Sequence, residues 1–482
     1  MQYDLVVIGG GPAGVTAALR ARELGAETAL IERARLGGTC TNDGCAPTRV
    51  LAKAARLLRD AGQFELYGLH APTPTVDFAA VIERTQQVIY TLHEKKQLIA
   101  HLETVGVDAL HGVGNARFHD PHTLALADGR MVEAEKFVIC AGGAPRRMAF
   151  PGSEYTHTHS DVWSFKHLPA SVIVVGAGAT GCQFASILAA FGAQVTLMEV
   201  APRLLITEDQ AVSTLMEREF RESGVRIITG IGGVERVERE GKMLRLHYTH
   251  DGKPQTAEAE AIILSVGWPG NVPDLNLPAA GVETQRNYIV VNDQMQTSAP
   301  HIYAAGDITG KMMLVQSAGY QARAAVENAL LNRPTSVQHR LVPHGGFTDP
   351  EYGSVGLTEE QAREQYDCAV AVVPYADLDR AVIDGHTNGF CKLIVDRATR
   401  RVIGGHVVGE QAVEIVQLLS AGMNANMQVE QLADLELAYP TYTAIVGLAA
   451  RDLVRQLGIV PVSAEWRALK QIRGAEWERK SE

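Results

Sequence analysis

Residues 5–32 read LVVIGGGPAGVTAALRARELGAETALIE, and this stretch decides the fold. Its first four residues form an apolar run, a glycine-rich turn follows, and residues 15–24 have the Ala-rich composition of a helix. A second apolar run from Thr28 to Ile31 then ends on Glu32. The order of strand, glycine turn, helix, strand and acid is that of a βαβ unit that binds a dinucleotide.

The three glycines of this turn, Gly9, Gly11 and Gly14, have different tasks in such a unit. Gly9 permits the tight turn, and Gly11 lets the backbone approach the pyrophosphate. Gly14 lets the helix pack close to the strand, and the N-terminus of that helix faces the phosphates. Glu32 is placed to accept hydrogen bonds from the ribose hydroxyls.

The same pattern recurs in residues 172–199, VIVVGAGATGCQFASILAAFGAQVTLME. Its glycines are Gly176, Gly178 and Gly181, and its second strand ends on Glu199. In both units the acid lies 18 residues beyond the third glycine. One glycine turn is weak support for a cofactor site. Two complete units predict two dinucleotide cofactors, and a flavin with a nicotinamide is the natural pair.

The composition is that of a globular protein with several domains, because 482 residues exceed one ordinary core. A net charge of −11 without a basic block argues against nucleic acid or an anionic membrane as a partner. No apolar run is long enough to cross a bilayer, and the N-terminus lacks the cationic start of a signal peptide. Six cysteines do not make a disulfide scaffold in so long a chain, so we expect a cytoplasmic protein.

Later segments complete the expected fold. Residues 137–140 read as a buried strand that runs into a turn at Gly142, and residues 302–305 read as a strand just before Asp307. Beyond residue 340 strand and helix patterns alternate, at residues 391–395, 402–407, 412–425 and 443–457. The sequence therefore predicts an α/β fold with two Rossmann-like dinucleotide-binding domains and a C-terminal α+β domain.

A cysteine pair follows the first unit, in residues 37–48, GGTCTNDGCAPT. Cys40 and Cys45 are close enough in sequence for a strained local disulfide at the start of a helix, where the pKa of a thiol is lowered. Zinc is the competing interpretation, but the chain has no second Cys pair or His cluster at ligand spacing. We therefore expect a redox pair and no metal site. The other cysteines lie in apolar patterns and are expected to be inert core residues: Cys140, Cys182, Cys368 and Cys391.

Taken together, these motifs resemble the pyridine nucleotide–disulfide oxidoreductase family, which includes dihydrolipoamide dehydrogenase, glutathione reductase and mercuric reductase. The resemblance covers nearly the whole chain. It includes both glycine motifs, the GGTC-x4-C-x-P segment, and residues 265–271 (SVGWPGN) in place of a TGRxPN-like turn. It continues with Ala305-Gly306-Asp307 and with residues 347–350 (FTDP), which open the C-terminal domain.

The resemblance implies an obligate homodimer with FAD bound by the first unit and a nicotinamide nucleotide by the second. The implied domains are an FAD-binding domain (1–150), an NAD(P)-binding domain (151–270), a central FAD-binding part (271–340) and a dimerisation domain (341–482). Cys45 becomes the thiolate next to the flavin and Cys40 the thiol that meets the substrate. The implied FAD-binding residues are Gly9, Gly11, Gly14, Glu32, Gly38, Thr39, Arg49, Gly142 and Asp307. The implied nicotinamide-binding residues are Gly176, Gly178, Gly181, Gln183 and Glu199.

Glu199 also bears on the choice of nicotinamide nucleotide. Members of the family that prefer NADPH tend to carry basic residues at this place. A carboxylate repels a 2′-phosphate and bonds a 2′-hydroxyl, so we expect NADH to be preferred. Arg203 lies nearby and leaves NADPH possible.

The chain departs from the family at the proton-handling segment. Disulfide-reducing members carry a His-Pro-Thr-x-x-Glu segment that is donated across the dimer, but here it reads Tyr439-Pro440-Thr441-Tyr442-Thr443-Ala444. A phenol that titrates near pH ~10 cannot replace a base that works near neutrality. Near the flavin, the family's Lys–Glu ion pair is expected to become Arg49 with the neutral amide of Gln183.

These departures favour an enzyme that passes electrons from NADH through FAD and the cysteine pair to a small acceptor: a metal ion such as Hg(II), a quinone or an oxidised sulfur species. Tyr439 is similar to the tyrosine of mercuric reductases and is a candidate catalytic residue, although the tail lacks their vicinal cysteine pair and no N-terminal metal-carrier domain is expected. Two alternatives stay open: a dihydrolipoamide dehydrogenase-like enzyme with another base, and a non-enzymatic redox sensor or assembly subunit. The charged tail, residues 473–482, is expected at the surface or disordered.

Overall fold

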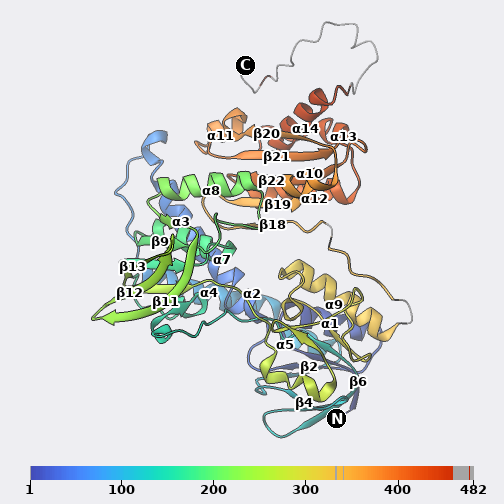
Figure 1. The fold of residues 1–482 in the computed structure, drawn as a ribbon. Helices are drawn as coiled ribbons and strands as arrows, with labels where there is room; N and C mark the ends of the chain where they lie inside the picture. Colours follow the sequence, from blue (N-terminus) through green and yellow to red (C-terminus); the bar gives the residue numbers. More distant parts are fainter. Residues whose placement is uncertain (1, 332–333, 340, 460–476, 478–482) are drawn as a thin grey trace.

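The structure is a computed structural model that describes residues 2–331, 334–339, 341–459 and 477 (Figure 1). Apart from Trp477, the tail from residue 473 lies outside the described residues. The strands within residues 2–139, together with the segment around residues 300–330, form the part that carries the N-terminus. The second glycine unit lies between that part and the C-terminal part.

The first sheet is built around the first glycine unit. β1 (Gln2–Ile8), β2 (Thr28–Glu32), β3 (Val107–His111) and β6 (Met131–Ile139) are parallel in the order β3-β2-β1-β6. On the side of β6 opposite β1, β17 (Ile302–Ala304) pairs in parallel with its last residues and β5 (Thr123–Ala125) pairs antiparallel with its first residues. The short strand β4 (Arg117–Asp120) is antiparallel to β5. The sheet thus joins segments that are far apart in sequence.

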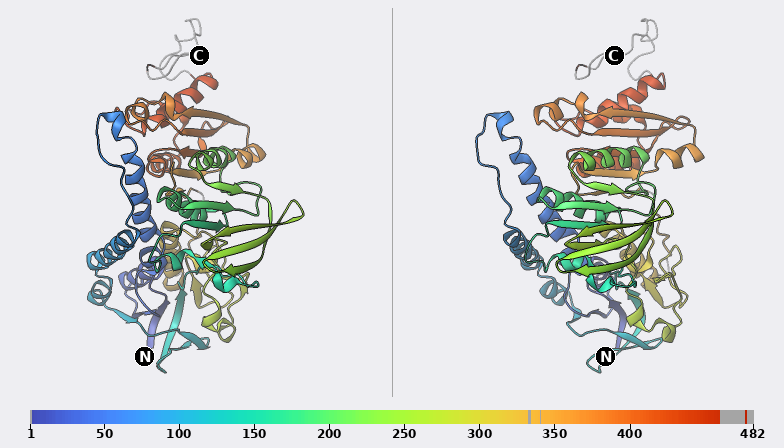
Figure 2. Two further views of the ribbon diagram at one scale, coloured as in Figure 1. Left: turned by 90° about the vertical axis from the view of Figure 1, so that its left-hand side faces the viewer. Right: turned by 60° about the vertical axis from the view of Figure 1, so that its left-hand side comes forward.

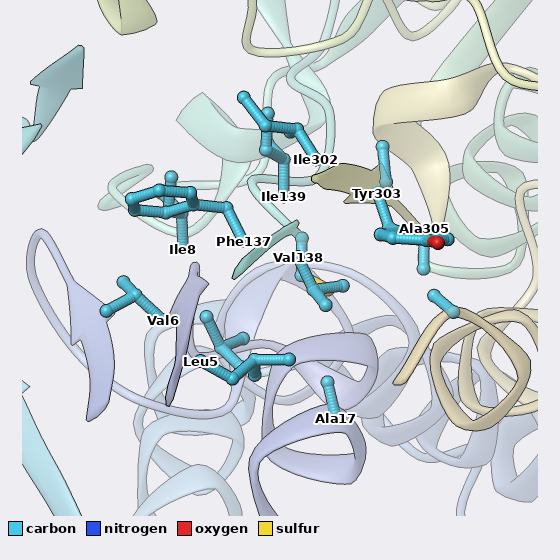
Figure 3. Close-up of a cluster of buried hydrophobic side chains, with 14 of the residues drawn as sticks. Leu5, Val6, Ile8, Ala17, Phe137, Val138, Ile139, Ile302, Tyr303 and Ala305 are labelled. Atoms are coloured by element: carbon cyan, nitrogen blue, oxygen red, sulfur yellow. The ribbon is translucent and has the colours of Figure 1, made fainter. Parts of the chain in front are cut away.

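Helix α1 (Pro12–Glu23) lies beside α9 (Val315–Leu330) against this sheet. The helix begins three residues before the expected Val15, because Pro12 is favourable in the first turn of a helix. Leu5, Ala17 and Val138 are fully buried in the core between helix and strands (Figure 3). Since β1, β6 and β17 are parallel, the residues that follow them lie at one edge of the sheet, and that edge carries the first glycine turn.

The second glycine unit forms a separate parallel sheet in the order β10-β9-β8-β14-β7. Its strands are β7 (His157–Thr158), β8 (Ser171–Val175), β9 (Gln194–Met198), β10 (Arg226–Ile228) and β14 (Ala261–Leu264). Its helices are α6 (His159–Val162), α7 (Ala179–Ala190) and α8 (Gln210–Glu222). An antiparallel meander of β11 (Ile231–Glu240), β12 (Met243–His250) and β13 (Lys253–Ala259) flanks it.

The C-terminal part is an antiparallel sheet in the order β18-β19-β22-β21-β20, with α12 and α14 packed on it. Its strands are β18 (His344–Gly346), β19 (Tyr352–Gly356), β20 (Cys368–Pro374), β21 (Phe390–Asp396) and β22 (Val402–Val408). Its main helices are α10 (Glu359–Gln365), α12 (Ala412–Asn424), α13 (Val429–Ala433) and α14 (Ala444–Gln456). The expected fold class, two Rossmann-like units and a C-terminal α+β domain, is confirmed; the domain boundaries stay predictions.

The cysteine segment begins with α2 (Gly38–Asn42) and continues into α3 (Cys45–Ala61), which is followed by α4 (Phe78–Lys96). In Figure 2, α3 and the loop after it extend along the second sheet towards the C-terminal part. Arg59 donates to the carbonyl oxygen of Ser186 in α7 (2.8 Å), and Tyr67 donates to the carbonyl oxygen of Ile383 (2.7 Å). The segment from Cys45 to Tyr67 is therefore attached to both other parts of the molecule.

Candidate active site

A cavity of about 1150 Å³ lies where the first glycine turn, the cysteine segment, α7 and the C-terminal part meet. Ten of the residues expected to bind cofactor or act in catalysis line it: Gly9, Gly11, Glu32, Gly38, Thr39, Cys40, Cys45, Gly142, Gln183 and Asp307. The other expected residues do not line it: Gly14, Arg49, Gly176, Gly178, Gly181, Glu199 and Tyr439. The cavity thus unites the first unit with the cysteine pair, and the second unit reaches it through the first turns of α7.

The first glycine turn is shaped as a dinucleotide site requires. Gly9 has φ +107°, a conformation that favours glycine. A Cβ on Gly14 would lie 1.7 Å from the carbonyl oxygen of Gly9, so only glycine permits this close packing of helix and strand. Glu32 accepts hydrogen bonds from the backbone N–H groups of Gly10 (2.7 Å) and Ala34 (2.8 Å). The carboxylate is therefore fixed at the cavity wall, and it keeps lone pairs for further donors.

The second turn repeats this geometry. Gly176 has φ +98°, and a Cβ on Gly181 would lie 1.8 Å from the carbonyl oxygen of Gly176. Glu199 accepts from the backbone N–H groups of Ala177 (2.6 Å) and Ala201 (2.9 Å), as Glu32 does in the first unit. The two units share one design.

The helix that leaves each turn begins without a side-chain cap. Gly11 precedes α1 with φ −77° and ψ −173°, and Gly178 precedes α7 with φ −74° and ψ −173°. The free N–H groups of an uncapped N-terminus and the positive end of the helix dipole suit a phosphate. A Cβ on Gly178 would meet nothing within 4 Å, so the backbone is open to a ligand there. The residues present therefore fit two dinucleotides.

Cys45 is the first residue of α3, and Cys40 lies in α2. Both are free thiols joined by a hydrogen bond. That bond from Cys40, with help from a backbone N–H, lowers the pKa of the Cys45 thiol to about 7, although burial opposes the shift. The same bond and burial raise the pKa of Cys40 well above its usual range. Of the two thiols, Cys45 is therefore the one that ionises first, while Cys40 keeps its proton.

Asp307 follows β17 and lines the same cavity as the first glycine turn. Burial raises the pKa of its carboxyl group. Of the other cysteines, Cys140 and Cys391 are buried, and burial raises the pKa of each to about 12, in keeping with the expected inert role.

The expected pairing of Arg49 with Gln183 is wrong. Arg49 forms an ion pair with Glu351 (Nη1 to Oε1, 2.8 Å) and stacks over the ring of Phe347 at 4.6 Å. Gln183 instead accepts from the backbone N–H of Phe347 (3.2 Å) and donates to the carbonyl oxygen of Ala179 (2.9 Å). The sequence could not reveal Glu351 as the partner, because it lies 302 residues from Arg49 and only the fold brings the two together.

Tyr439 lies in the C-terminal part, away from the cavity of its own chain. Its side chain is 55% exposed, its hydroxyl donates to Asp379 Oδ2 (2.8 Å), and its ring packs against Trp477 at 4.9 Å. A contact between Tyr439 and the thiols therefore requires a second copy of the chain.

Sequence reasoning missed two histidine–carboxylate pairs in the cavity wall. Asp43, between the two cysteines, lies 3.3 Å from His159 Nε2. His344 Nε2 lies 3.0 Å from Glu208 Oε1, and both ring nitrogens of His344 face acceptors, since Nδ1 lies 3.3 Å from the Val342 carbonyl oxygen. No motif connects these residues in sequence, so only the unusual acid inside the cysteine spacer could have drawn attention to one of them.

A metal-ligand cluster and a membrane-spanning helix are both absent from the described part of the chain. No group of three or more His, Cys, Asp or Glu side chains is arranged to hold a metal ion. Among these same residues, no helix combines the length and apolar character that crossing a membrane requires.

Comparison with known proteins gives a consistent family. The model of the pyridine nucleotide-disulphide oxidoreductase family matches residues 3–322, and that of its dimerisation domain matches residues 342–462. A mercuric reductase of Lysinibacillus sphaericus is 32% identical over 93% of this chain and 82% of its own length. A dihydrolipoyl dehydrogenase of Chlorobaculum tepidum is 33% identical over 95% of this chain and 98% of its own.

Among solved structures, the Cu(II) complex of RclA, an HOCl-induced flavoprotein disulfide reductase of Escherichia coli, superposes with a TM-score of 0.84. It is 28% identical to this chain, and the match covers 94% of this chain and all of RclA. FAD and NAD(P)H are the cofactors of this family. The chain therefore belongs to the pyridine nucleotide-disulphide oxidoreductase family and is an FAD- and NAD(P)H-dependent oxidoreductase with a C-terminal dimerisation domain.

Proposed function

We propose that the protein uses NADH to reduce a small thiophilic acceptor at Cys40 and Cys45, with a soft metal ion such as Hg(II) as the first candidate. The observation that carries the proposal is that Cys40 and Cys45 line one cavity together with the first glycine turn. The hydrogen bond between the two thiols lowers the pKa of Cys45 to about 7, which favours Cys45 as the thiolate. Bound FAD and a bound nicotinamide nucleotide would supply the electron pair that reaches the two sulfurs.

A soft metal ion fits the chemistry of this pair better than a disulfide does. Thiolate sulfur is the ligand that soft metals prefer, and two sulfurs lie in one wall. Reduction of a disulfide must deliver a proton to a leaving thiolate, for which the family uses its His-Glu dyad. The overall reaction NADH + Hg(II) → NAD⁺ + Hg(0) + H⁺ instead releases a proton, so it does not need the proton donor that the family's histidine provides.

The roles of single residues belong to the same proposal. The first glycine turn, Glu32 and Asp307 would hold FAD, and the second turn with Glu199 would hold the nucleotide. The preference for NADH is supported by the hydrogen bonds of the Arg203 guanidinium. Its guanidinium donates to three backbone carbonyl oxygens, those of Leu205, Ile206 and Glu208, and to the hydroxyl of Ser213. This arginine is bound within its own loop and is a poor partner for a 2′-phosphate.

The homodimer is supported by the dimerisation domain. In such a dimer the partner's copy of the exposed segment around Tyr439 is the candidate to face the thiols, which makes Tyr439 a candidate contact for the acceptor. The names of two relatives agree with a metal acceptor, since one is a mercuric reductase and RclA was solved with Cu(II). A cytoplasmic location is part of the proposal and fits a chain of 482 residues with only six cysteines.

The test is an anaerobic acceptor panel with NADH as donor: Hg(II), Cu(II), a quinone, oxidised lipoamide and glutathione disulfide. Metal-dependent NADH oxidation should exceed turnover of either disulfide by at least about a hundredfold, the scale of the missing acid–base help. Cys40→Ser and Cys45→Ser should abolish it, whereas Cys368→Ser, a buried cysteine away from the cavity, should not. Metal reduction that survives the loss of Cys45 would refute the proposal.

A second candidate is a dihydrolipoamide dehydrogenase-like enzyme with another base. It is favoured by the Chlorobaculum tepidum relative, which this chain covers almost completely. Rapid turnover of lipoamide in the same panel would establish it. A sensor without turnover would instead show NADH-dependent reduction of the pair and no activity with any acceptor.

A further inference from the structure

The cavity wall near α7 has an unusual set of polar groups. In the part of the chain that the structure describes, the cavity-lining residues of α6, α7 and β18 include no Lys or Arg. The titratable side chains there are two histidines, His159 and His344, each held by a carboxylate. Of these, His159 is connected to the cysteine segment through Asp43.

Asp43 is held in a fixed orientation by three donors. Trp163 Nε1 donates to Asp43 Oδ1 (2.9 Å), and the hydroxyl of Ser160 donates to Oδ2 (2.6 Å). His159 Nε2 lies 3.3 Å from the same Oδ2. Although burial opposes them, the hydrogen bonds from His159 and Ser160 lower the pKa of the Asp43 carboxyl, so Asp43 is a carboxylate.

These contacts decide which nitrogen of His159 carries its proton. Nε2 faces Asp43 Oδ2 and, at 3.3 Å, the oxygen of Ser160. The carboxylate of Asp43 can only accept a hydrogen bond. The hydroxyl of Ser160 donates its proton to Asp43, so its oxygen can only accept from Nε2, and both neighbours of Nε2 are acceptors. The proton of a neutral imidazole therefore sits on Nε2, and Nδ1 is left with a lone pair.

The imidazole ring that carries this lone pair is packed between aromatic rings in the cavity wall. His159 is 3% exposed and lies against Trp268 (ring centroids 4.7 Å apart) and Phe184 (6.4 Å). All three residues line the cavity. Among the residues that the structure describes, Nδ1 has no hydrogen-bond partner. Nδ1 is not among the fully enclosed atoms that lack a partner, and His159 lines the cavity, so this nitrogen can accept from a ligand of the cavity that carries an N–H or O–H group.

We infer that His159 Nδ1 accepts a hydrogen bond from the carboxamide N–H of the nicotinamide ring, and that Asp43 is a positioning residue that fixes the required tautomer. The inference rests on the proposed binding of the nucleotide at the second glycine turn. The first residues of α7, Ala179 and Thr180, line the same cavity as His159, and Phe184 of this helix lies against the His159 ring (ring centroids 6.4 Å apart). Because Asp43 lies between Cys40 and Cys45 in the sequence, its contact with His159 would also fix the imidazole ring relative to the two thiols.

The test compares NAD⁺ with 3-acetylpyridine adenine dinucleotide, whose acetyl group replaces the carboxamide and has no N–H. Both are titrated by calorimetry into the oxidised, FAD-loaded enzyme, so turnover plays no part. One hydrogen bond predicts that the wild type binds NAD⁺ roughly three- to tenfold more tightly. In His159→Leu the ratio of the two dissociation constants should fall to about one.

Asp43→Asn gives a second variant that keeps size and shape. The indole of Trp163 can only donate, so the amide oxygen of Asn must stay at the Oδ1 position and its NH₂ must replace Oδ2. The NH₂ then donates to His159 Nε2, the proton moves to Nδ1, and that nitrogen becomes a donor. The ratio should therefore shift in favour of the acetyl analogue, whose carbonyl accepts.

The matched control is His247→Gln. His247 also pairs with a carboxylate, Glu238 (3.0 Å), but it lies on β12 outside the cavity. Its nucleotide ratio should equal that of the wild type. A wild-type ratio near one, or a ratio that survives both His159→Leu and Asp43→Asn, overturns the inference.

ADP-ribose, which lacks the nicotinamide, separates this failure from failure of the proposed placement. Its affinity should fall in Glu199→Ala and stay unchanged in His159→Leu. If Glu199→Ala leaves ADP-ribose binding intact, the placement at the second turn is wrong. If Glu199→Ala weakens ADP-ribose binding, but the ratio of the two dissociation constants is the same in His159→Leu as in the wild type, only the role of His159 is wrong.

Discussion

Cys45 owes its thiolate character mainly to one neighbour, Cys40, whose hydrogen bond is the largest influence on its pKa of about 7. In Cys40→Ala that bond is lost, and the pKa of Cys45 should rise towards the ordinary thiol value of 9.0. The pH dependence of Cys45 alkylation in the reduced protein, followed by mass spectrometry, measures this shift. A labelling midpoint that stays near 7 in Cys40→Ala would mean that the helix N-terminus, and not Cys40, stabilises the thiolate.

Tyr439 and Ala444 stand where disulfide-reducing enzymes similar to this chain are expected to carry His and Glu. If the missing His-Glu dyad limits disulfide reduction, Tyr439→His with Ala444→Glu should raise lipoamide turnover at least about tenfold, since general acid–base help is worth about 10² to 10⁴. Steady-state rates at neutral pH measure it. Tyr439→His alone is the control, because a histidine without its carboxylate partner should gain less. Unchanged activity in the double variant would locate the block elsewhere, for instance in a narrow acceptor channel.

At the scale of elements, the start of α8 is joined to the C-terminal sheet by buried charges. Asp209 caps α8 and is 1% exposed, and it accepts from Lys392 of β21 (2.8 Å) and from the backbone N–H of Glu359 (2.9 Å). Lys392→Met should cost about 3 to 5 kcal/mol of stability, because it leaves Asp209 buried without its cation. Chemical denaturation of the FAD-loaded protein measures the change. Arg245→Met, which breaks exposed ion pairs, is the control and should have little effect.

A second contact between the residues at the start of α8 and the C-terminal sheet, the pair of Glu208 with His344 of β18, depends on pH. Burial lowers the pKa of His344, but the hydrogen bond and charge of Glu208 outweigh burial and raise the pKa above 6.5. A raised folded-state pKa means that the pair stabilises fully below the unfolded value and less as pH rises through the folded value. The thermal midpoint of the wild type should therefore fall as the pH rises above 6.5, and that of His344→Gln should fall less. Equal slopes in the two proteins would show that this pair does not link β18 to the second unit.

At the scale of the whole molecule, the sequence predicts features that depend on neighbouring residues. It does not predict contacts between segments that only the fold brings together. Both glycine turns were predictable, since φ near +100° and close helix packing leave only glycine at fixed spacings. The carboxylate partner of Arg49 was not, because Glu351 reaches it from the C-terminal sheet. Asp43 was visible in the cysteine spacer, but its partners Ser160 and Trp163 lie 117 and 120 residues away.

The central claim is that electrons from the nicotinamide nucleotide reach Cys40 and Cys45. Anaerobic titration of the oxidised, FAD-loaded dimer with NADH, followed by differential alkylation and mass spectrometry, tests it most directly. One equivalent of NADH per chain should convert Cys40 and Cys45, and no other cysteine, from unreactive to alkylated, with both conversions lost in Cys45→Ser. NADH oxidation that leaves both residues unreactive would contradict the account.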